Sequence, residues 1–260
     1  EGPEFETVMS FGSNCGVDDI VDVMRANQLC DRFGLDVISC GDVVAGYLES
    51  EDAFGDADLV RETVEKIAHR EGVGDTLAEG IDRAHGTLGI DNWTVKGLEF
   101  PAHDGRALNG QGLSFATANR GADHMYATFY AYEYPLVSQD QAFDPDGLGA
   151  HKAEKLVELE NLRALEDCGV VCRFSRSYMT PDRFEQLFDA DYDELLDVGG
   201  RVVELERHFN NQRGFSRADD RLPYEIDGLE AALDTYYETR GWTDRGIVPS
   251  VGGESGAAAD

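Results

Sequence analysis

The chain has 260 residues, with 52 Asp and Glu against 22 Lys and Arg, which gives a formal net charge of −30. This length accommodates one large domain or two smaller ones, and we expect two. The charge argues against nucleic acid and anionic membranes as partners, because both would be repelled. No apolar run is long enough to span a membrane, and the first residues lack the regions of a signal peptide, so we expect a cytoplasmic protein.

The acidic residues are not confined to a tail. They are spread along segments that also carry periodic apolar residues, such as Val60–Ile67 and Val202–Phe209. Such a surface repels itself at low salt and is screened at molar salt. The chain also has four lysines against 22 − 4 = 18 arginines. We therefore expect a salt-adapted protein from a halophile.

Apolar residues recur at helical spacing along most of the chain. Between Asp18 and Cys30 this spacing predicts a helix, and Gly34 suits a left-handed cap at its end. The same criteria predict helices at Asp42–Leu48, Leu59–Arg70, Asp75–His85, Asn119–Tyr132, Lys152–Leu165, Asp193–Phe209 and Asp227–Tyr237, with one more beginning at Pro181. Because alternating strand patterns are nearly absent, we predict a mainly α, multihelical fold.

The stretch from Gly86 to Asn109 interrupts this rhythm with Gly, Asn, Trp, Pro and His. We place a domain boundary there, which gives one helical domain at 1–92 and another at 93–250. The small residues at 251–260 are expected to form a disordered tail.

Two segments echo each other weakly, Asp31–Asp36 and Asp167–Cys172. Each follows a predicted helix and has the layout Asp, three residues, an aliphatic residue, then Asp or Cys. One such turn alone is a common way to end a helix. Two of them, on two all-α subdomains related by this repeat, would suit a flat heterocycle with amino and ring N–H groups, such as a pterin.

The five cysteines are an odd number and do not suggest a disulfide framework. Cys168 and Cys172 would share a helical face, where two buried thiols are the ordinary alternative to a metal site. An iron–sulfur cluster would need ligands from outside this chain. Taken alone, His103 and His124 are by default structural histidines.

Read together, several stretches resemble the aldehyde:ferredoxin oxidoreductase family, tungsten-pterin enzymes with a four-iron cluster. The resemblance runs to Ser250 and covers the second and third family domains. It rests on Gly2–Thr7, Gly12–Cys15, Asn27–Asp36, Gly97–Asp104, Asn119–His124, Asp167–Phe174, Glu206–Arg207, Phe209–Asn210, Gly214–Arg217, Asp219–Pro223 and Tyr236–Trp242.

The resemblance implies specific roles for residues of this chain. It places Glu6 and His124 beside the metal as catalytic residues, on what would be an active-site helix for His124, and His103 in the substrate pocket. It makes Cys172 the fourth cluster ligand. The residues that it assigns to a tungsten or molybdenum bis-pterin are Asp31, Leu35, Asp36, Arg120, Asp167 and Val171.

The implied reaction is oxidation of a small aldehyde to a carboxylic acid, with electrons passing through a 4Fe-4S cluster to ferredoxin. The implied partners are the missing N-terminal domain and ferredoxin, and a homodimer is compatible with this interpretation. The family's first domain and three clustered cysteines are absent here, Tyr126 replaces a lysine found in some members, and Val170 replaces a common glycine. We therefore expect the chain to be inactive alone. The alternative is a non-catalytic helical binding module, or an isolated structural fragment, without cofactor.

Overall fold

The structure is a computed structural model that describes residues 2–134, 136–175 and 178–249. Its contacts divide the chain into two compact units. The first runs to Asp104 and includes Arg120–Asp123, and the second comprises Gly105–Asn119 and the chain from His124 onward. Helices dominate both, and the described residues contain one two-stranded sheet, which confirms the mainly α fold. No helix in this part of the chain is long and apolar enough to cross a membrane.

The first unit is built around α2, whose sequence explains its length. Asp19 begins the helix by accepting a hydrogen bond from the backbone N of Val21 at 2.8 Å. Gly34 ends it in the left-handed conformation, as predicted. The elements of this unit are α1 (Phe5–Val8), the π-helical turn η1 (Met9–Ser13), α2 (Ile20–Phe33), α3 (Val37–Glu51), α4 (Ala57–His69), α5 (Val73–Leu77), α6 (Ile81–Leu88), β1 (Thr94–Val95) and β2 (Leu98–Glu99).

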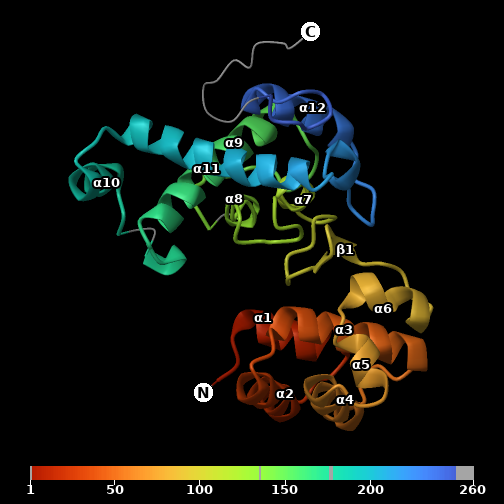
Figure 1. Cartoon of the computed structure of the whole chain (residues 1–260). Coiled ribbons are helices and arrows are strands. Elements are labelled where there is room, and N and C mark those ends of the chain that lie inside the picture. Colours follow the sequence, from red (N-terminus) through yellow and green to blue (C-terminus); the bar gives the residue numbers. More distant parts are fainter. Residues whose placement is uncertain (1, 135, 176–177, 250–260) are drawn as a thin grey trace. The chain divides into compact units, whose positions relative to one another are not determined.

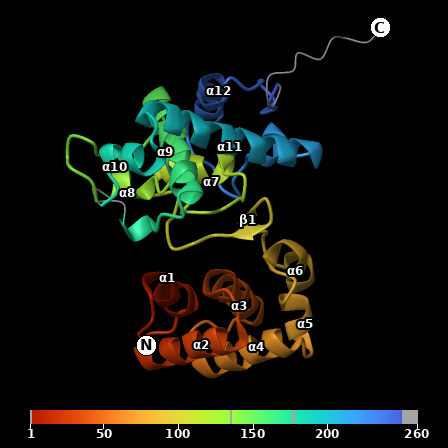
Figure 2. The same ribbon diagram turned by 60° about the vertical axis from the view of Figure 1, so that its left-hand side comes forward.

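One apolar core joins these helices. Figure 2 shows α2 and α4 side by side, and both pack on α3. Val44, Leu48 and Val64 have no exposed surface in this core. Fully burying each such side chain contributes about 1.5–3 kcal/mol.

The hairpin of β1 and β2 belongs to the first unit, although the sequence suggested a boundary after Asn92. Glu99 anchors it, since Oε1 accepts from the backbone N of Ile81 at 2.9 Å and Oε2 from Ser39 Oγ at 3.0 Å. On the other side, a Cβ at Gly121 would lie 2.1 Å from the carbonyl oxygen of Val95. These contacts attach the hairpin to α3, α6 and the returning loop.

The second unit centres on α9, α11 and α12, which pack together (Figure 1). A Cβ at Gly199 of α11 would lie 2.0 Å from the carbonyl oxygen of Asn161, so only glycine permits this approach of α9 and α11. The elements of this unit are α7 (Asn109–Thr117), α8 (Tyr130–Glu133), α9 (Ala150–Cys168), η2 (Arg173–Ser175), α10 (Pro181–Phe188), α11 (Tyr192–Gln212), η3 (Arg217–Asp219) and α12 (Leu229–Arg240).

A buried ion pair ties the last described segment to α11. Arg207 has no exposed surface, and its Nη1 and Nη2 donate to the two carboxylate oxygens of Asp220 at 2.9 and 2.7 Å. Its Nε donates to the carbonyl oxygen of Gly246 at 2.8 Å. Removing one partner of such a pair leaves a buried charge uncompensated, at about 3–5 kcal/mol.

Two predicted helices were wrong in extent. The helix expected at Asp75–His85 is interrupted between α5 and α6, where Gly80 has φ of 84°. The helix expected at Asn119–Tyr132 is mostly a loop, because Gly121 and Thr128 have φ of 100° and 55°. The other predicted helices are present, within shifted ends. The tail predicted at 251–260 lies outside the described residues.

Candidate active site and cofactor-binding turns

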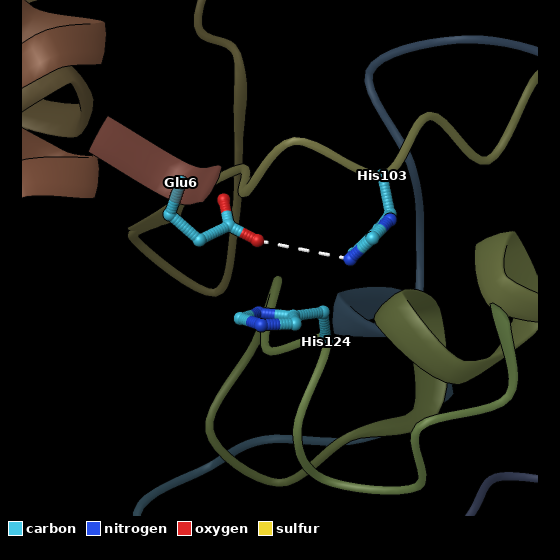
Figure 3. Close-up of side chains that lie close together, drawn as sticks. All are labelled: Glu6, His103 and His124. Carbon is cyan, nitrogen blue, oxygen red and sulfur yellow. Dashed lines mark ion pairs between the residues drawn. The ribbon is translucent and has the colours of Figure 1, made fainter. Parts of the chain in front are cut away.

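A half-buried carboxylate, Glu6, and a buried imidazole, His103, form a pair in the first unit. Oε1 of Glu6 lies 3.7 Å from Nε2 of His103 (Figure 3), and their side chains are 16% and 7% exposed. Oε2 of Glu6 accepts a hydrogen bond from the backbone N of Ala102 at 2.8 Å. The carboxylate therefore has a fixed orientation, with one oxygen directed at the imidazole. Such a pair can hold or move a proton.

The segment that carries His103, residues 98–104, is held by two further carboxyl groups, those of Glu99 and Asp42. Glu99 makes the contacts described above, and Oδ2 of Asp42 on α3 accepts from the backbone N of Phe100 at 3.0 Å. Burial and then the negative charge of Glu99 raise the pKa of Asp42 to about 8, although the hydrogen bond from Phe100 acts in the opposite direction. Sequence reasoning missed Asp42, which stands between Gly41 and an apolar run.

His124 follows directly on Asp123, the last residue of the loop that belongs to the first unit. Contrary to prediction, it is not on a helix, since the left-handed Gly121 prevents one. The imidazole is half-buried, with its centroid 6.0 Å from that of Tyr130. Arg120 begins the loop, with its side chain 71% exposed and Nη1 3.0 Å from Oδ2 of Asp123.

The first predicted pterin turn ends α2. Gly34 has φ of 70°, and the backbone N of Leu35 donates to the carbonyl oxygen of Cys30 at 2.9 Å. The Leu35 side chain packs against the core of the first unit. The Leu35 side chain therefore attaches the turn to the apolar core.

Two exposed carboxylates flank this turn. Oδ2 of Asp31 accepts from Nδ2 of Asn27 at 2.9 Å. Asp36 begins α3, and its Oδ1 accepts from the backbone N of Ser39 at 2.8 Å. Asp36 thus has a helix-capping role that needs no ligand.

The second predicted turn ends α9 with the same backbone arrangement. Val170 occupies the left-handed position at φ of 55°, and the backbone N of Val171 donates to the carbonyl oxygen of Glu166 at 2.9 Å. In both turns, the residue that follows the left-handed one donates its backbone N–H to the carbonyl oxygen of the residue five positions earlier. The Val171 side chain packs on Leu165 and its neighbours. The sequence echo corresponds to a repeated local structure.

Most other side chains of the second turn are exposed, namely those of Asp167, Cys168, Val170 and Cys172. Oδ2 of Asp167 accepts from Nη2 of Arg173 at 2.8 Å. Cys168 is the last residue of α9 and Cys172 lies beyond it, and both thiols are exposed. Phe174 is 86% exposed nearby in the chain.

These features fit the cofactors that the sequence suggested. Exposed carboxylates at Asp31, Asp36 and Asp167 can accept hydrogen bonds from the amino and ring N–H groups of a pterin. The exposed thiol of Cys172 can supply one ligand to an iron–sulfur cluster, which needs more thiolates than this turn provides.

A family model described as "Aldehyde ferredoxin oxidoreductase, domains 2 & 3" matches residues 1–251. The chain belongs to this family. Tungsten-containing aldehyde ferredoxin oxidoreductases of Pyrococcus furiosus and Thermococcus kodakarensis are 33% and 32% identical to it over 96% of its length. These alignments cover 47% of each relative, so the chain spans about half the length of these aldehyde ferredoxin oxidoreductases. The resemblance noted in the sequence is confirmed.

Two further proteins are similar to this chain. The WOR-like subunit of an aliphatic sulfonate oxidoreductase from Pyrococcus furiosus is 25% identical over 95% of this chain and 44% of its own length. A solved structure, the active site complex BamBC of benzoyl coenzyme A reductase with 1,5-dienoyl-CoA, superposes with a TM-score of 0.75 at 18% identity. It covers 94% of this chain and 47% of that one, and at this identity the likeness concerns the fold alone.

Proposed function

We propose that this chain is the C-terminal part of a tungsten or molybdenum pterin oxidoreductase. The complete enzyme oxidises a small aldehyde to a carboxylic acid and passes electrons through a 4Fe-4S cluster to ferredoxin. Membership of the family supports this proposal, and so do the names of the relatives. The observation that carries it is the Glu6–His103 pair, in which the Glu6 carboxylate is fixed by the backbone N of Ala102.

The two turns would hold the pterin groups. Asp31 and Asp167 would accept hydrogen bonds from the heterocycle, and Cys172 would ligate the cluster, with the remaining three cysteines outside this chain. When bound, the metal supplies Lewis acidity and two-electron redox chemistry. The remaining residues proposed for the pterin groups are Leu35, Asp36, Arg120 and Val171.

The proton chemistry falls to residues of this chain. Glu6, through Oε1, would take or return the proton of the water or substrate at the reacting carbon. His124 would donate a hydrogen bond to the carbonyl oxygen, where negative charge develops. His103 would shape the pocket while it orients Glu6.

The part of the relatives that this chain lacks would complete the site. The exposed surface around Cys172 supports this expectation, as does the coverage of about half of each relative. We therefore propose an N-terminal domain as the first partner and ferredoxin as electron acceptor, and expect no aldehyde oxidation from the 260-residue chain alone.

Substitution of Glu6 and of His124 in the complete enzyme tests this proposal. Glu6→Gln and His124→Ala should each lower kcat for aldehyde oxidation at least about a hundredfold while tungsten and iron contents stay unchanged. The exposed-helix variant Glu65→Gln serves as a control with normal turnover. Normal rates in the Glu6 and His124 variants would contradict the assignment. Absence of metal from the complete, anaerobically purified protein would favour the non-catalytic module instead.

A further inference from the structure

Asp42 connects the two segments that carry Glu6 and His103. Oδ1 of Asp42 accepts a hydrogen bond from Nδ2 of Asn14 at 2.8 Å, at the end of the helical segment that begins with α1 and continues through η1. Oδ2 accepts from the backbone N of Phe100 at 3.0 Å, three residues before His103. One carboxyl group therefore bridges the helix of Glu6 and the segment of His103.

The position of Asp42 is itself fixed by close packing. At the preceding residue, Gly41, a Cβ would lie 2.4 Å from the Cβ of Ser10 in η1. Helix α3 and η1 therefore meet with no space for a side chain at Gly41. Asp42 directly follows Gly41 in α3, so this close contact limits the movement of its carboxyl group. The two hydrogen bonds of Asp42 therefore start from a fixed position.

We propose that Asp42 is a positioning residue for the Glu6–His103 pair, because it fixes the segment of His103 against the helix that carries Glu6. This proposal rests on the proposed function for its catalytic consequence. A displacement of the segment by even about 1 Å would be enough to slow a reaction that depends on the geometry of the pair.

The charge state of Asp42 adds a testable property. The ionisable groups that face it are Glu99, Glu6 and the buried thiol of Cys15. With a pKa near 8, Asp42 holds its proton at neutral pH and loses it in mildly alkaline solution. Ionisation places a further negative charge beside two carboxylates, and the repulsion opposes the close arrangement of the segment.

Two substitutions separate the effect of the two Asp42 hydrogen bonds from the effect of its charge. Asp42→Asn retains an oxygen for Phe100 and an amide that can pair with Asn14, but it cannot ionise. Asp42→Ala removes both hydrogen bonds. In the complete enzyme we expect the wild-type kcat to fall above about pH 8, as Asp42 ionises. Asp42→Asn should keep kcat within about twofold of wild type at pH 7 and should lack this alkaline fall. Asp42→Ala should lower kcat at least about tenfold at every pH, with KM changed less than about threefold.

The matched control is Asp58→Asn, a conservative change at a side chain 90% exposed on α4, which should keep the wild-type pH profile. A wild-type kcat in Asp42→Ala would overturn the proposal, as would an unchanged alkaline fall in Asp42→Asn.

A second readout does not depend on aldehyde oxidation. In the complete protein labelled with ¹⁵N-histidine, the ring signals of His103, assigned with His103→Gln, should shift between pH 7 and 9 as Asp42 ionises. This shift should be absent in Asp42→Asn, and Asp42→Ala should alter the signals at all pH values. Identical His103 signals in all three proteins would overturn the positioning role. If the signals behave as expected but no aldehyde is oxidised, the proposed function fails and the positioning role stands.

Discussion

At the residue scale, three carboxyl groups fix one segment of the first unit. Glu6, Asp42 and Glu99 each accept a backbone N–H group, and together they hold residues 98–102 in place. Their value as acceptors comes with an electrostatic cost, because Asp42 is removed from water and close to two acids. The carboxyl groups fix the geometry of this segment, and the burial of Asp42 near other acids lowers the stability of the fold.

This cost should be visible in the pH dependence of stability. The pKa of Asp42 rises from 3.8 to about 8 on folding, so the unfolded state loses its proton first as pH rises. Asp42 therefore lowers the free energy of unfolding between about pH 4 and pH 8, by at most about 1.4 kcal/mol per pH unit. We expect Asp42→Asn to gain stability relative to wild type through this window and to keep a constant difference above it. Urea unfolding at five pH values measures the difference, and a pH-independent difference would contradict the assignment.

Val170 provides a second prediction at a single residue. It is β-branched, left-handed and 93% exposed, so its side chain adds strain and little packing. Val170→Gly should raise the free energy of unfolding by about 1 kcal/mol in urea titrations. Val21→Gly, at a half-exposed position of α2, should instead lower it by about 0.5 kcal/mol. Changes of the same sign in both variants would show that strain at Val170 is not significant.

The residues of the candidate site were only partly visible in the sequence. Glu6, His103 and the two turns could be named because they stand in recognisable local patterns. Asp42 could not, since its role depends on Asn14 and Phe100, which lie far from it in sequence. Burial of one acid by distant segments leaves no periodic signal.

At the scale of elements, amphipathic helices were the most predictable features. Helix α2 has Val23, Ala26 and Cys30 on its buried face, with a capping Asp19 and Gly34 at its ends. These local signals and the core agree, and the predicted helix is therefore present.

Helix α7 shows where such signals fail. Its residues are buried on every side except at Asn109, including the polar Gln111 and Ser114, so no apolar stripe distinguishes it. The reverse holds for 119–132, where apolar residues have helical spacing but Gly121 and Thr128 adopt positive φ. Tertiary contacts decide both cases, because the contact of Gly121 with Val95 requires the left-handed backbone.

The packing of α9 on α11 gives a prediction for these elements. Gly199→Ala should lower the free energy of unfolding by about 1–3 kcal/mol, because its Cβ would enter the backbone of α9. The neighbouring Gly200→Ala meets only the side chain of Asn161, at 3.3 Å, and should be neutral or slightly stabilising. Chemical denaturation of both variants makes the comparison, and equal effects would contradict the close contact.

At the scale of the whole molecule, the net charge of −30 predicts a strong dependence on salt. Raising KCl from about 0.2 M to about 2 M should increase the free energy of unfolding, because the Debye length falls to a few ångströms. Sucrose of equal osmolality is the control, since it leaves the charges unscreened. Stability that is unchanged or lower in KCl would contradict the expected dependence on salt.

The interrupted first unit has a consequence for synthesis on the ribosome. Residues 105–119 belong to the second unit, and the chain then returns as Arg120–Asp123, where Gly121 contacts the hairpin at Val95. Domains generally fold as they emerge, from the N-terminus. The first unit therefore cannot finish folding until Asp123 has left the exit tunnel. While α7 is being synthesised, the hairpin of the nascent chain still lacks its contact with Gly121.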